Sequence, residues 1–108
     1  MSKSNNTTVI SGTEIKLNIH IDPLGELHMS NYNFECKFYI FPKNFIIVKK
    51  EDMVKVDEDN YLAIVDTTSL GVGKLHLTVT AEIPDSDFGD DTRREIACVC
   101  TGIEIVNC

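Results

Sequence analysis

The sequence predicts an all-β protein built from two packed antiparallel sheets. Apolar and polar residues alternate in run after run, which is the side-chain period of a half-buried strand. Turn-forming residues separate most of the six to eight runs, and no segment has a helical period long enough for more than one turn. Two face-to-face sheets bury such strands most economically, and a small β-barrel is the alternative.

The first half of the chain contains two long alternating runs. The odd positions are apolar over residues 14–21 and the even positions over residues 34–41, so each run turns one face toward a core. Pro42 ends the second run because it has no backbone N–H to give to a central ladder. Turn-forming residues after each run predict turns at 22–25 and 42–44.

The middle of the chain predicts shorter elements. Brief strands are expected at 45–48, 53–56 and 61–65, with an interruption at 49–52 and a polar turn at 57–60. Residues 66–71 predict one helical turn, with Asp66 as its N-cap and Gly71 as its end.

The two longest strands are expected at 74–83 and 94–106. The last strand contains a change of parity: its apolar residues are even-numbered up to Cys100 and odd-numbered after Gly102. A β-bulge near Gly102 would explain this, since one extra residue moves the following side chains to the other face. The parity therefore predicts that Ile96, Cys98 and Cys100 face the core.

The four cysteines, Cys36, Cys98, Cys100 and Cys108, are expected to be reduced thiols. The N-terminal residues contain no apolar run that resembles a signal peptide, so disulfide-forming export is not expected. Cys98 and Cys100 lie two apart on one face of a strand, which suits small core side chains. Their spacing does not match a structural zinc site.

Charge and hydropathy limit the partners. The formal net charge of −7 would repel nucleic acid and anionic membrane surfaces, so neither is expected as a partner. No run is long and apolar enough for a transmembrane helix. Residues 1–12 are predicted to form a flexible polar arm, and residues 13–108 a single β-sandwich domain.

The stretch IPDSDFGDDTRRE, residues 83–95, joins the two longest strands. Its aspartates fail the EF-hand register, because Gly89 falls at the fifth position and Ile96 at the twelfth. A looser calcium site is left as an alternative for Asp85, Asp87, Asp90 and Asp91. The main expectation is a solvated loop without metal, whose candidate partner contacts are Asp85, Asp87, Phe88, Asp90, Asp91, Arg93 and Arg94.

No arrangement of residues predicts catalysis. Neither Ser69 nor Ser86 has the flanking glycines of a nucleophile elbow, and no glycine-rich loop precedes a helix. The carboxylates of residues 85–91 lie on a polar loop, where nothing desolvates one of them as a general acid requires. We therefore expect no catalytic residue, no cofactor and no enzymatic activity.

Residues 66–105 resemble small immunoglobulin-like β-sandwich proteins of bacteriophages and prophages of gut bacteria, including N-terminal modules of upper baseplate proteins. The matching residues are Asp66, Leu70, Gly71, Gly73 and Leu75, then Ile83, Pro84, Asp85, Asp87, Phe88 and Arg93, then Thr101, Gly102 and Ile103. Gly89 and the additional acids depart from that pattern. The resemblance implies an immunoglobulin-like sandwich of about seven strands.

The resemblance also implies a non-enzymatic virion protein: a tail, baseplate or fibre adaptor, or an accessory capsid protein. Such a subunit would be made in the bacterial cytoplasm and would assemble with other virion proteins or with copies of itself, through its sandwich surface and N-terminal arm. A soluble ligand- or carbohydrate-binding module is the alternative function. The absence of Trp and the presence of only three Tyr count against sugar binding, which commonly uses exposed aromatic rings.

Overall fold

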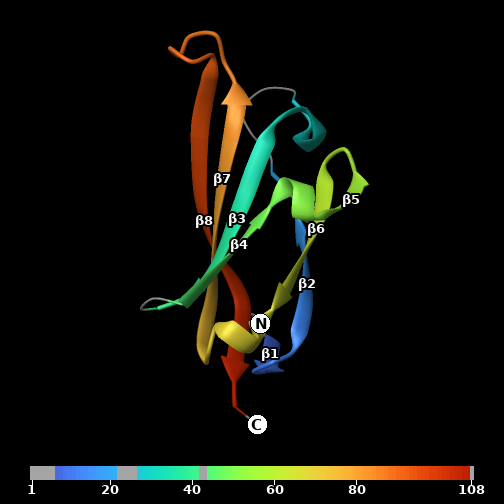
Figure 1. The fold of residues 1–108 in the computed structure, drawn as a ribbon, viewed down its shortest axis with the longest axis vertical. Helices are drawn as coiled ribbons and strands as arrows, with labels where there is room; N and C mark the ends of the chain where they lie inside the picture. The colour runs from blue at the N-terminus through green and yellow to red at the C-terminus, as the bar shows by residue number, and fades with distance from the viewer. Residues whose placement is uncertain (1–6, 22–26, 42–43, 108) are drawn as a thin grey trace, which may run out of the picture.

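The computed structural model describes residues 7–21, 27–41 and 44–107, and it confirms an all-β fold (Figure 1). A five-stranded sheet has the order β1-β8-β7-β3-β4, and a three-stranded sheet the order β2-β6-β5. The strands are β1 (Thr7–Ile10), β2 (Glu14–Ile19), β3 (Asn33–Ile40), β4 (Asn44–Lys49), β5 (Val54–Asp57), β6 (Asn60–Asp66), β7 (Gly73–Pro84) and β8 (Thr92–Val106). Short 3₁₀ turns lie at η1 (Met29–Asn31), η2 (Lys50–Asp52) and η3 (Thr67–Ser69).

The two sheets form a sandwich-like arrangement, and the molecule is elongated at 50 × 34 × 23 Å. All described strand pairs are antiparallel except β1 with β8, which is parallel. The β7–β8 hairpin lies at one end of the long axis of the molecule (Figure 1). Among the described residues, no helix has the length and apolar character to cross a membrane.

The alternation predicted for the longest runs is confirmed in the core. The even residues of β3 and the odd residues of β7 are buried, and they pack with residues of the three-stranded sheet. Fully enclosed core side chains include Phe38, Leu75, Ile83, Ile105 and Val65. Burial of side chains of this size stabilises a fold by about 1.5–3 kcal/mol each, before the loss of conformational entropy is counted.

The predicted helical turn is also confirmed. Its N-cap, Asp66, accepts a hydrogen bond from the backbone N–H of Thr68 at 2.9 Å. Gly71 follows the turn with φ +82°, a left-handed conformation that favours glycine. The predicted turn at 22–25 and the Pro42 and Lys43 part of the turn at 42–44 lie outside the described residues.

Strand β1 lies within the segment that composition predicts to be a flexible arm. Its residues pair with β8 from Thr7 opposite Ile103 to Ile10 opposite Val106. This segment is polar and has few core contacts. Pairing with β8 supplies its backbone with the hydrogen-bond partners that a free arm would find in water. Composition alone does not reveal such a partner, which is distant in the sequence.

The parity of β8 differs from the prediction. The ladder with β7 does shift near Gly102, which has φ +78°. However, two residues along β7, from Lys74 to His76, are matched by four along β8, from Glu104 to Cys100. A shift of two preserves the parity, so odd residues face the core side along the ladder and even residues face away. The predicted inversion of faces was therefore wrong.

Thr67 ties the crossing from β1 to β2, where the chain passes from one sheet to the other. Its side chain is fully buried, donates to the carbonyl oxygen of Thr13 at 2.7 Å and accepts from the N–H of Gly12 at 3.0 Å. A buried hydroxyl is tolerated when it is hydrogen-bonded in this way. The crossing and η3 are thereby held as one unit.

Asp59, in the turn between β5 and β6, contacts several residues near η1. Its carboxylate contacts His28 Nδ1 at 2.9 Å, and its backbone carbonyl oxygen lies 2.8 Å from His20 Nδ1. The neighbouring Glu58 carbonyl oxygen accepts from the N–H of Ser30 at 3.1 Å. Hydrogen bonding and charge from Asp59 raise the pKa of His28 above 6.5.

The raised pKa of His28 predicts a pH-dependent part of the stability. A group whose pKa is higher in the folded protein stabilises fully below its unfolded pKa, here 6.5, and loses that contribution as pH rises through the folded value. We expect Tm to fall from about pH 6 to about pH 8, and part of that fall to be absent in His28→Asn. Thermal melts monitored by circular dichroism measure this. Equal slopes for wild type and His28→Asn would contradict the assignment.

Candidate assembly surface

The acidic stretch forms the hairpin loop at the end of β7 and β8. The N–H of Asp85 donates to the carbonyl oxygen of Asp91, and the N–H of Asp91 to that of Phe88, both at 2.9 Å. Asp91 has φ +63°, a left-handed conformation that Asp tolerates better than most residues. The Asp85 carboxylate accepts from the N–H of Asp87 at 3.0 Å. The loop is thus ordered by its own backbone.

Arg93 closes the base of this loop. Its guanidinium contacts the carboxylates of Asp85 at 2.6 Å and Glu95 at 2.7 Å. The backbone N–H of Asp87 and then Arg93 hold the pKa of Asp85 below its usual value. The two carboxylates raise the pKa of Arg93, so its charge is matched within the hairpin.

The structure divides the predicted contact residues into two sets. Asp85 and Arg93 bind each other, whereas the others are exposed: Asp87, Phe88, Asp90, Asp91 and Arg94. Within residues 7–21, 27–41 and 44–107, no group of three or more His, Cys, Asp or Glu side chains is arranged to hold a metal ion. The four aspartates of the calcium alternative are therefore not gathered into such a group.

A larger feature, which sequence reasoning missed, is the outer face of the five-stranded sheet, turned away from the three-stranded sheet. Cross-strand pairing places Cys100, His76, Tyr39 and Phe45 in one row, and Cys98, Thr78, Lys37 and Ile47 in the next. The Tyr39 and His76 rings stack at 5.4 Å, and Phe41 packs on His76 at 5.0 Å. We call these residues, with Ile96, the outer-face patch.

Strand β8 is uncovered on both faces over part of its length. Ile96, on the outer face, is 60% exposed, and Val99, on the core side, is 45% exposed. Cys98 and Cys100 are also exposed, so the prediction that they pack in the core was wrong. The preserved parity of β8 places them outside, and the three-stranded sheet does not extend over the core side of β8 at this level.

The backbone edge of β8 is open as well. One side pairs with β7 from Pro84 opposite Thr92 down the strand. On the other side, β1 begins only at Ile103. In the part of the chain that the structure describes, no strand pairs with this second side from Thr92 to Gly102.

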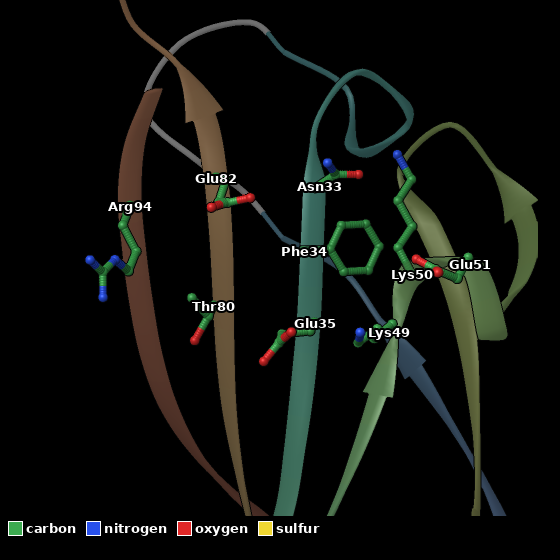
Figure 2. Close-up of a pocket in the computed structure, with 9 residues that line it drawn as sticks. All are labelled: Asn33, Phe34, Glu35, Lys49, Lys50, Glu51, Thr80, Glu82 and Arg94. Atoms are coloured by element: carbon green, nitrogen blue, oxygen red, sulfur yellow. The ribbon is translucent and has the colours of Figure 1, made fainter. Parts of the chain in front are cut away.

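A shallow pocket of about 440 Å³ lies beside the outer-face patch (Figure 2). Charged residues of both signs line it: Glu35, Lys49, Lys50, Glu51, Glu82 and Arg94. The Lys50 amine donates to the backbone carbonyl oxygens of Met29 at 3.0 Å and Tyr32 at 2.7 Å. Burial lowers the pKa of Lys50. Its amine bonds both carbonyl groups, so it acts as a tether between η2 and η1.

The arrangement therefore suits contact between proteins. An open strand edge offers main-chain hydrogen bonds, and the adjoining apolar side chains offer area to bury. No family model, curated protein or solved structure matches the chain.

Loss of the Lys50 tether is expected to destabilise the fold. Lys50→Met keeps the aliphatic stem but removes both hydrogen bonds, leaving two carbonyl groups without that donor. We expect the free energy of unfolding to fall by about 1–3 kcal/mol. Lys49→Met is the matched control, because Lys49 is exposed, and it should change stability by less than about 0.5 kcal/mol. Urea denaturation measures both, and equal losses would refute the tether.

The thiols are expected to differ sharply in reactivity. Burial and the charge of Glu35 raise the pKa of Cys36 to about 12, while Cys98 and Cys100 are exposed. A chromogenic disulfide reagent at about pH 8 should label Cys98 and Cys100 quickly and Cys36 only after unfolding. Cys98→Ser/Cys100→Ser should lose their share of the fast phase, and Cys36→Ala should retain it. Uniformly slow labelling of all three in dilute protein would contradict the exposure of Cys98 and Cys100 in the single chain.

Proposed function

We propose that this protein is a non-enzymatic structural subunit of a phage particle, with an immunoglobulin-like sandwich that assembles with neighbouring proteins or with itself. Its place in a particle rests on the resemblance of residues 66–105 to phage sandwich proteins. The observation that carries the assembly role is the apolar, uncovered stretch of β8. An apolar surface joined to an open edge is typical of a protein interface.

The strand order supports the immunoglobulin-like topology. In such domains, the second, fifth and fourth strands form one sheet, and the last, sixth and third strands form the other, with an added neighbour in variable-type domains. Counting β2 as the second strand, the observed orders β2-β6-β5 and β8-β7-β3-β4 follow that scheme. The fully buried Phe38 of β3 stands in the centre of the core.

The acidic loop fits this function as a secondary contact. Its tip exposes Phe88, 48% accessible, among carboxylates. Residues of the loop and of both strands surround a shallow hollow of about 560 Å³, which Phe88, Asp90, Arg93 and Arg94 help to line. A partner that carries a basic residue beside an apolar one would complement this tip.

The proposal predicts that the protein is a fixed component of intact particles. Mass spectrometry of gradient-purified particles should find it at a constant ratio to the other structural proteins. Val99→Lys places a charge on the uncovered strand and should lower its incorporation by about tenfold or more. Val54→Lys is the matched control, because Val54 is 50% exposed on an edge strand of the other sheet. Absence of the wild-type protein from intact particles would refute the proposal.

A further inference from the structure

We infer that the open edge of β8, from Thr92 to Gly102, binds a second copy of this chain by antiparallel β8–β8 pairing. The two five-stranded sheets would then continue into one another across a two-fold axis. This inference rests on the proposed assembly function and names the partner of that surface.

Over residues 96–102, the edge lacks the usual protection against strand addition. Proteins commonly guard long edge strands with Lys, Pro, bulges or a covering element. From Ile96 to Gly102, β8 contains no charged residue and no Pro, and the ladder irregularity occurs only beyond Cys100, where β1 is about to begin. The charges of this edge are confined to its start, at Arg93, Arg94 and Glu95. The outer edge of β4, by contrast, ends in the exposed Lys49, and that of β5 carries the exposed Lys55.

Charge favours a second copy as the occupant. The chain carries −7 overall, so two copies repel each other over most of their surfaces. The open edge of β8 is different: two arginines and one glutamate give it a formal charge of +1, and residues 96–102 contain no Asp, Glu, Lys or Arg. A basic partner would be drawn to the acidic segments instead. The uncharged stretch of residues 96–102, which is identical in both copies, suits an isologous interface.

Strand β1 fixes the register of this pairing. Because β1 occupies the same side of β8 from Ile103 onward, a second β8 can lie only along residues 92–102. Full overlap of that stretch in two antiparallel copies places Ala97 opposite Ala97. Arg93 then faces Thr101 and Glu95 faces Val99, so no like charges oppose each other.

The same register buries the side chains that the single chain leaves uncovered. Ile96 of each copy lies beside Cys98 of the other on the outer face, and the Ala97 pair lies between two Val99 residues on the core side. On the outer face Ile96 gains an apolar neighbour, and on the core side Val99 lies opposite the aliphatic part of Glu95 and diagonally beside Ala97, so both exposed faces of β8 become covered. The small side chain of Ala97 permits close approach at the two-fold axis.

The first test is the molar mass of the full chain in solution. Light scattering after size exclusion should give a dimer for the wild type at about 100 µM, dissociating on dilution. Val99→Glu should weaken dimerisation by about tenfold or more, because residue 99 faces Glu95 of the other copy and like charges would then oppose each other, and Ile96→Lys should do the same. Val54→Lys and Ile64→Lys, at similarly exposed positions of the three-stranded sheet, should leave it unchanged. Circular dichroism melts verify that each variant is folded.

A monomeric wild type across that concentration range would overturn the inference. A dimer that Val54→Lys or Ile64→Lys disrupts as strongly as Ile96→Lys would also overturn it, because the contact would then lie on the other sheet.

The second test measures the register. In a Cys98→Ser/Cys100→Ser/Cys108→Ser background, Ala97→Cys should form a covalent dimer under mild oxidation at least about tenfold faster than Ile64→Cys, because directly opposed strand residues have nearby Cβ atoms. Equal rates would overturn the pairing. Both tests use purified protein alone, so a monomer that is still found in intact particles would refute self-pairing and leave the particle proposal standing.

Discussion

The three-stranded sheet is too narrow to cover the whole core side of the five-stranded sheet, and the exposure of part of β8 follows from this difference in width. The smaller sheet encloses the core side of β3 and β7, whose inward residues are buried, but it ends short of β8 at the level of Val99. The uncovered part of β8 then exposes apolar side chains on both faces. Such a surface is costly to leave in water, and a protein that retains it has a reason to bury it elsewhere.

A few polar contacts hold the connections between the strands in place. Thr67 holds the point where the chain changes sheets, and Lys50 links η2 to the carbonyl oxygens around η1. Each of these polar groups has its hydrogen-bond partners within the fold. The same holds for Arg93, whose charge is matched by Asp85 and Glu95. These groups fix the positions of the connections and of the loop beside the assembly surface.

Alternation in the sequence was sufficient to predict the strands of the core. Because side chains in a strand repeat every two residues, the alternation shows which residues share a face. It predicted the buried set in β3 and β7 and the cap at Asp66, where local chemistry decides the structure. It did not state which face of β8 would be covered, since that depends on the width of the opposing sheet. The parity change at Gly102 was therefore interpreted as an inversion, and Cys98 and Cys100 were assigned to the core. Strand β1 escaped prediction because its stability comes from pairing with distant residues of β8.

The division of β8 into a core-directed end and an uncovered end bears on how such a protein can vary. Ile105 is enclosed at one end, so substitutions there are constrained by packing. Ile96, Cys98 and Cys100 contribute little to the enclosed core, so they can change identity at small cost to folding. One end of β8 thus maintains the fold, whereas the residues at its other end can change along with the partner that they contact. Interfaces on this scaffold can diverge while the fold persists.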